Sequence, residues 1–228
     1  MKEEELIELL NKFRKASGKN GGMRPKERYS SFDYCFNYFQ SFKNKKEIAD
    51  VKNLEASCLH LGFYLASWGM LRGSSFLLEK SIAYLKDIIN FIANFNQRIW
   101  NIDLEYSEED IEILLNFKNK LIKRFGNDKN KFSDTLITKI MLGVFGNVPA
   151  YDNYFKMFLK DNNYDQTFNK KSLEGLNDLY KKNRKLICRQ ARNTKTFNFI
   201  SEKKSDLSYT RAKIIDMIGF SYGQINSK

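Results

Sequence analysis

Helical periodicity dominates this chain, and proline, which interrupts helices and strands alike, occurs only twice, at Pro25 and Pro149. Apolar residues recur at the spacing of one helix face, and no convincing run alternates between apolar and polar residues as a half-buried strand does. The sequence therefore predicts an all-α protein. The expected helices cover residues 3–15, 33–42, 56–71, 76–95, 108–125, 133–144, 150–159, 172–192 and 208–222.

The most turn-rich stretch lies near the N-terminus, where residues 17–25 read SGKNGGMRP. Glycine, asparagine, serine and proline favour turns, so a loop is expected here. This boundary predicts an N-terminal helix and loop over residues 1–25, followed by a single helical domain over residues 26–228. A chain of 228 residues is long enough for such a domain to bury a sizeable core.

Composition excludes several classes of protein. Hydrophobic residues make up 42% of the chain, which rules out a largely disordered protein. The longest apolar stretch, residues 58–71, is too short to span a bilayer, and the N-terminus lacks the pattern of a signal peptide. Three widely spaced cysteines fit neither a disulfide scaffold nor a four-cysteine metal site. We therefore expect a soluble, reduced, cytoplasmic protein without a metal or another cofactor.

Positive charge is in excess and is concentrated in two runs. Lysine and arginine total 39 against 27 acidic residues, a net charge of +12, which favours an anionic partner such as nucleic acid or an acidic membrane surface. Residues 118–131 carry six positive side chains, and residues 181–195 carry seven. Such density suits phosphate binding, although the solvated face of a basic protein has the same pattern.

The two basic runs flank the segment with the most suggestive chemistry, residues 135–159. An apolar helix leads into a glycine turn, and Val148-Pro149 then precedes Asp152 at the start of a second helix. Free backbone N–H groups and the helix dipole stabilise a carboxylate in the first turn of a helix. Asp152 is therefore a candidate site residue facing a cleft, or simply the cap of its helix.

This segment resembles the catalytic hinge of the helix–hairpin–helix DNA glycosylases, in which a helix ending in Leu-Gly runs into Val-Pro-x-Asp. It resembles most closely the bacterial 8-oxoguanine-DNA-glycosylase-like proteins, in which a Ser/Thr-Lys pair precedes Pro-x-x-Asp. The matching residues here are Thr138-Lys139 and Pro149 to Asp152. Residues 65–70 and 211–217 are also similar to core and closing helices of those proteins. The resemblance implies a two-lobed helical domain with a hinge near residues 126–152.

In that family the aspartate stabilises the positive charge that develops on the deoxyribose as the base departs, which gives this role to Asp152. Lys139 matches a lysine that attacks the sugar, although a lysine on a helix is also commonly a surface charge. The phosphate-binding hairpin of the family reads Leu-Pro-Gly-x-Gly, whereas residues 126–134 here read GNDKNKFSD. The candidate DNA-binding residues are Lys129 and Lys131, which would replace that hairpin as point charges, with Asn153, Lys181, Lys182, Arg184, Arg189 and Arg192.

A base that is cleaved from DNA must leave the duplex and enter a pocket lined by aromatic and polar side chains. Two segments offer such side chains, residues 28–39 and the helix that contains Trp68 and Arg72. Aromatic residues at these spacings are also typical of a hydrophobic core. The candidate base-pocket residues are Tyr29, Asp33, Tyr34, Tyr38, Trp68, Arg72 and Tyr151.

Taken together, these features predict a DNA glycosylase that removes a damaged or modified base and leaves an abasic site, in repair or in defence against phage with modified DNA. We expect it to act as a monomer on DNA, without a membrane. Two alternatives remain open: a non-catalytic helical nucleic-acid-binding module in which Asp152 is only a cap, and an interaction protein whose basic face binds an acidic partner.

Overall fold

The computed structural model describes residues 2–16, 23–73, 75–124 and 132–227. It is mostly helical, at 70%, with ten α-helices, several short 3-10 helices and one two-stranded hairpin among the described residues. The α-helices are α1 (Glu3–Ala16), α2 (Ser31–Ser41), α3 (Val51–Ser67), α4 (Leu85–Ala93), α5 (Glu108–Arg124), α6 (Asp134–Phe145), α7 (Asn153–Asp161), α8 (Lys170–Lys182), α9 (Arg184–Asn193) and α10 (Arg211–Asn226). The antiparallel strands are β1 (Lys195–Phe197) and β2 (Lys204–Ser208).

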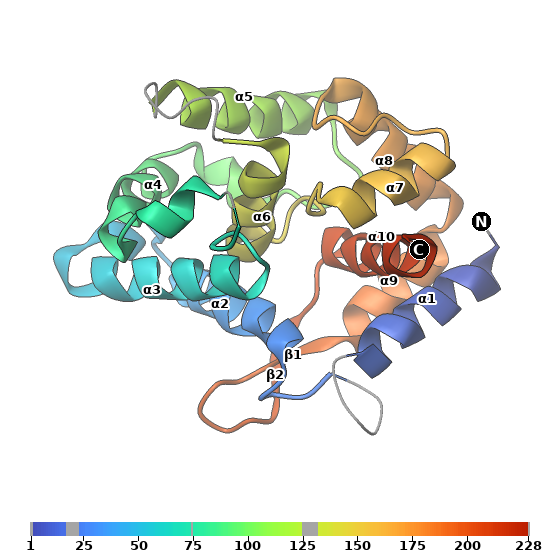
Figure 1. The fold of residues 1–228 in the computed structure, drawn as a ribbon, viewed down its shortest axis with the longest axis horizontal. Helices are drawn as coiled ribbons and strands as arrows, with labels where there is room; N and C mark the ends of the chain where they lie inside the picture. The colour runs from blue at the N-terminus through green and yellow to red at the C-terminus, as the bar shows by residue number, and fades with distance from the viewer. Residues whose placement is uncertain (1, 17–22, 74, 125–131, 228) are drawn as a thin grey trace.

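The helices form two groups on either side of α6 (Figure 1). Helices α2, α3 and α4 lie on the left of the view and pack on one another, and α2 and α3 both contact α6. Helix α10 lies on the right, where it packs against α1, α7 and α9. Because α6 and α7 follow each other in the chain, the turn between them joins the two groups.

Local sequence explains how this turn forms. The Ser133 hydroxyl caps α6 by accepting the backbone N–H of Leu136, and α6 is buried from residue 136 to its end. Gly146 ends α6 in the left-handed conformation, with φ of 69°. A side chain there would also meet the ring of Phe36 and the side chain of Thr210, so the position requires glycine.

The prediction of a helical protein is confirmed, but three elements differ from expectation. The expected helix over residues 76–95 is interrupted: short 3-10 turns at Phe76–Glu79 and Ile82–Tyr84 precede α4, because Lys80 and Ser81 are extended. The expected basic helix over residues 172–192 breaks at Asn183 into α8 and α9. The hairpin was not predicted at all.

The hairpin is held by tertiary contacts rather than by local propensity. Asp33 of α2 accepts the backbone N–H of Phe197 and the hydroxyl of Tyr209, which fixes both ends of the hairpin to the buried face of α2. With strands of three and five residues, its sequence carries too little alternation to be recognised. Within the described residues, no helix has the length and apolar character needed to cross a bilayer.

Candidate active site

A cavity of about 620 Å³ opens where the two helix groups meet. Its walls come from the turn that follows α3, from α6, from the start of α7 and from α10. The expectation that one helix carries both Trp68 and Arg72 is wrong, because α3 ends at Ser67. Helix α6 lies near the centre of Figure 1, and α7 and α10 lie to its right. Among its charged lining residues, three are cations and one is a carboxylate. The lining residues that matter for the chemistry are Arg28, Trp68, Arg72, Thr135, Lys139, Asp152, Asn153, Tyr154 and Phe220.

Asp152 lies at the N-terminus of α7 and is its cap rather than a residue of its first turn. Its Oδ1 atom accepts the backbone N–H of Phe155 at 3.0 Å, and its Oδ2 atom accepts the ammonium of Lys139 at 3.2 Å. The side chain is 17% exposed, and it lines the cavity. A carboxylate has about four acceptor positions, so Asp152 keeps free acceptor positions while it caps α7.

Lys139 is a buried lysine in the middle of α6. Only 3% of its side chain is exposed, and its ammonium lies 5.2 Å from the centre of the Trp68 ring. An ammonium this deeply buried requires an opposite charge or a π-face to offset its desolvation, and Asp152 and Trp68 supply both. The interpretation of Lys139 as an ordinary surface lysine is therefore wrong.

Five of the seven residues from Gly146 to Asp152 are hydrogen-bonded to other parts of the protein, and these bonds support Asp152. Hydroxyl groups of α6 bind the peptide units next to Asp152: Thr138 accepts the N–H of Tyr151, and Thr135 donates to the carbonyl of Tyr151. Further bonds to this segment come from Tyr106, Thr210 and Asp216, which bind Asn147, Gly146 and Ala150.

The bond to Ala150 comes from a buried ion pair on α10 that was not anticipated as part of the site. Asp216 accepts the N–H of Ala150 through Oδ1 and the ammonium of Lys213 through Oδ2, at 3.0 and 2.7 Å. The side chains of Lys213 and Asp216 are 2% and 8% exposed. Their three-residue spacing within an otherwise apolar helix was the signal in the sequence, since two charges on one face of a buried helix must pair.

Trp68 lies between the cavity and this second pair. Its ring stacks on Tyr29 with centroids 5.2 Å apart, and the ammonium of Lys213 lies 5.2 Å from its centre. The guanidinium of Arg28 lies 5.3 Å from the same ring. Together with Lys139, three cations therefore surround one indole, whose buried Nε1 has no hydrogen-bond partner among the described residues. The cavity wall is thus aromatic and electropositive.

Of the predicted base-pocket residues, the structure brings only some to this cavity. Trp68 and Arg72 line it, and Tyr29 supports Trp68 from behind, where burial raises the pKa of its phenol. Tyr151 does not line it: the side chain is fully buried, its hydroxyl is bonded to that of Ser172, and burial raises its pKa.

The other three predicted base-pocket residues lie elsewhere. Asp33 is fully buried among α2, β1 and Tyr209, and burial raises its pKa to about 6 against the opposing effect of its hydrogen bonds. Tyr38 stacks on His60, and Tyr34 contacts Phe199 of the hairpin. These three side chains therefore belong to the core or its edge and not to the cavity.

The predicted DNA-binding residues also divide. Asn153 lines the cavity beside Asp152. The predicted basic residues of α8 and α9 do not line it, and two of them are matched by acids: Arg184 pairs with Glu105, and Arg189 pairs with Glu3. Lys181, Lys182 and Arg192 are exposed and form no ion pair among the described residues. Lys129 and Lys131 lie outside the described residues.

Among the described residues, no group of three or more His, Cys, Asp or Glu side chains is arranged to hold a metal ion. No protein-family model, curated protein or solved structure matches the chain.

Proposed function

We propose that this protein is a DNA glycosylase that hydrolyses the N-glycosidic bond of a damaged or modified base turned out of DNA. The observation that carries the proposal is the pairing of the Asp152 carboxylate with the Lys139 ammonium at the wall of an aromatic, electropositive cavity. An aromatic wall stacks a flipped base, cations attract the flanking phosphates, and the carboxylate faces the same space.

The chemistry would proceed at the anomeric carbon of the sugar. The bond between this carbon and the base breaks, and the base leaves with the electron pair and takes up a proton. The Asp152 carboxylate stabilises the resulting positive charge on the sugar and accepts a proton from the attacking water. The products are a free base and an abasic site.

Lys139 offers a second route to the same cleavage. A neutral amine can attack the anomeric carbon and displace the base, which gives a Schiff base and then strand cleavage by elimination. Sodium borohydride reduces a Schiff base to a stable amine, so it would trap the protein on DNA only if Lys139 acts in this way. Under the hydrolytic route alone, wild-type protein leaves abasic sites and no trapped adduct.

The test compares wild type with Asp152→Asn on DNAs that contain uracil, oxidised, alkylated or glucosylated bases, with alkaline cleavage of abasic sites as the readout. Asparagine is as good a helix cap as aspartate, so this change removes the charge and keeps the cap. It also leaves the buried Lys139 ammonium without its counter-charge, so circular dichroism must first show that the variant is folded. Asp134→Asn is the matched control: its side chain is 16% exposed and pairs with Lys118, but it lies outside the cavity. We expect cleavage by wild type and by Asp134→Asn, and none by Asp152→Asn. The DNA that responds distinguishes repair of damage from defence against modified phage DNA.

A non-catalytic nucleic-acid-binding module is the second candidate, and one observation favours it. Asp152 does cap α7 through Phe155, which a purely structural aspartate would also do. This alternative predicts DNA binding without cleavage of any DNA in the panel, and the same affinity for wild type and Asp152→Asn. Binding to nucleic acid that weakens steeply with salt would argue against the third interpretation, an interaction protein whose basic face binds an acidic partner.

A further inference from the structure

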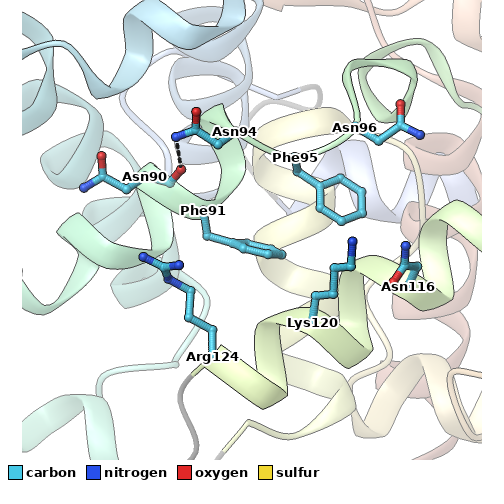
Figure 2. Close-up of a pocket in the computed structure, with 8 residues that line it drawn as sticks. All are labelled: Asn90, Phe91, Asn94, Phe95, Asn96, Asn116, Lys120 and Arg124. Atoms are coloured by element: carbon cyan, nitrogen blue, oxygen red, sulfur yellow. Dashed lines mark hydrogen bonds between the residues drawn. The ribbon is translucent and has the colours of Figure 1, made fainter.

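A second pocket of about 660 Å³ lies between α4 and α5 and shares no residue with the candidate active site. Figure 2 shows Phe91, Phe95 and Lys120 pointing into the space between the two helices, with the asparagine amides around its rim. The lining side chains are of three kinds: amides, aromatic rings and cations. The lining residues are Asn90, Phe91, Asn94, Phe95, Asn96, Asn116, Lys120 and Arg124.

The two cations come from one face of α5, because Lys120 and Arg124 are four residues apart. No acidic residue lines the pocket, and neither cation forms an ion pair with any described residue. This is unlike Lys118 on the same helix, which pairs with Asp134. Lys120 also lies over the Phe95 ring, with its ammonium 5.8 Å from the ring centre. Two exposed cations in one pocket, neither paired with an acid among the described residues, would attract an anionic ligand.

The amides and rings narrow the chemistry of that ligand. The amide of Asn116 has no hydrogen-bond partner among the described residues, and Asn90 and Asn94 use only their NH₂ groups, on main-chain carbonyls. These amides can therefore pair with donors and acceptors of a heterocycle edge, as asparagine does with adenine. The ring of Phe91 is half-buried, packed on Phe117 with centroids 5.1 Å apart, and it supplies a surface for stacking.

We propose that the α4–α5 pocket binds an unpaired nucleotide, with the base against Phe91 and the asparagine amides and the phosphate at Lys120 and Arg124. A carbohydrate would not need two cations, and an acidic peptide would not need an aromatic face with free amides. A nucleotide uses all three kinds of side chain. This inference rests on the proposed function only in taking a nucleic-acid strand as the ligand. Binding in this pocket requires no catalysis at Asp152.

The first experiment locates the bound base. A pentanucleotide containing 4-thiothymidine is crosslinked to the intact protein by long-wavelength light, and tryptic peptides are mapped by mass spectrometry. We expect an adduct within residues 87–98, the tryptic peptide that carries the amides and rings of α4. Adenosine monophosphate, added as a competitor at the concentration of the oligonucleotide, identifies the natural ligand. Loss of the adduct indicates that the pocket binds a free nucleotide, and persistence of the adduct indicates that it binds a nucleic-acid strand. Adducts found only in other peptides would overturn the proposal.

The second experiment separates the charges from the ring. The double variant Lys120→Gln/Arg124→Gln should lower the slope of log affinity against log salt by about 0.7, the value for one phosphate of a single strand. The control Lys86→Gln/Lys123→Gln removes the same charge from exposed positions on the same two helices, outside the pocket, and should leave the slope unchanged. Phe91→Leu keeps the charge and should weaken pentanucleotide binding on the order of tenfold.

Equal affinity of Phe91→Leu and wild type, or equal slopes for the two double variants, would refute the nucleotide site. These readouts are independent of base excision. Asp152→Asn, in the other cavity, should form the same adduct as wild type even if no DNA in the panel is cleaved. A failure of the proposed function therefore leaves this test intact.

Discussion

The buried Lys213–Asp216 pair allows the most direct test of how the candidate site is held. Lys213→Met removes the cation and leaves the Asp216 carboxylate buried without a counter-charge. Asp216→Asn keeps an oxygen for the N–H of Ala150 but leaves the Lys213 ammonium unpaired, among the rings of Phe13, Phe32 and Trp68.

The expected magnitude follows from the burial of both partners. Removing one member of a buried ion pair costs about 3–5 kcal/mol, because the other remains as an uncompensated charge. The two single changes would then sum to roughly 6–10 kcal/mol, which is comparable to the whole stability of a typical domain. The double variant buries no charge and keeps an acceptor for Ala150, so its cost should be about 1–3 kcal/mol, that of an imperfectly paired amide. The coupling energy is therefore at least about 3 kcal/mol.

Urea denaturation followed by circular dichroism measures all four proteins of this cycle. If a single variant does not fold, the double variant should still fold. Such a rescue would also show that the two charges compensate each other. Excision by the double variant should be retained, because Asp152 and its loop keep their bonds. Single changes costing under about 1 kcal/mol, or a double variant as unstable as the sum, would refute the view that the pair is charged and mutually compensated.

Three further changes test separate parts of the fold by urea denaturation. Gly223→Ala would place a methyl group against the backbone of Tyr154 and separate α10 from α7, at a cost of about 1–3 kcal/mol. The exposed neighbour Gln224 is the control, and Gln224→Ala should cost little. Equal effects of the two changes would contradict the close approach of α10 to α7. Burial raises the pKa of Asp33 to about 6 in the folded protein. Between about pH 4 and pH 6 the folded protein therefore binds a proton that the unfolded protein has released. As the pH rises through this window, the contribution of Asp33 to the free energy of unfolding falls by on the order of 3 kcal/mol. The difference between wild type and Asp33→Asn should carry that slope, and a flat difference would count against it. Ser133→Ala removes the cap of α6 and should cost about 1 kcal/mol, while Ser133→Asp should cost almost nothing.

The parts of the fold that local sequence encodes were predictable. Helix α5 begins within one residue of its serine and acidic cluster, and α6 begins directly after the cap at Ser133. The start of α7 was also located closely, although Asp152 proved to be the cap. In each case the signal lies within four residues of the boundary that it determines.

The parts that depend on distant contacts were not predictable. Asp33 is polar and lies beside aromatic residues, which suggested a binding pocket, yet its partners are more than 160 residues away in the chain. Periodicity within α2 carries no information about those partners. In the same way, Lys139 and Lys213 look like surface charges until the carboxylates that neutralise them are placed beside them. Whether a charged side chain is buried depends on tertiary contacts, which a single sequence does not show.

The cap of α7 differs from the other helix caps of this chain in the burial of the cation that it binds. Neutral side chains, Ser133 and Asn169, cap α6 and α8. Helix α10 is capped by Thr210 together with the carboxylate of Asp103, which accepts two N–H groups of its first turn and pairs with the partly exposed Arg211. Helix α7 instead uses a carboxylate that is bonded to an almost fully buried ammonium. Desolvation makes such a pair no better for stability than a neutral cap above an apolar side chain. What separates the α7 pair from the Asp103–Arg211 pair is the burial of its cation, at 3% against 29% exposed. The proposed reaction, which develops positive charge in the cavity, would give the Asp152 carboxylate a use beyond stability.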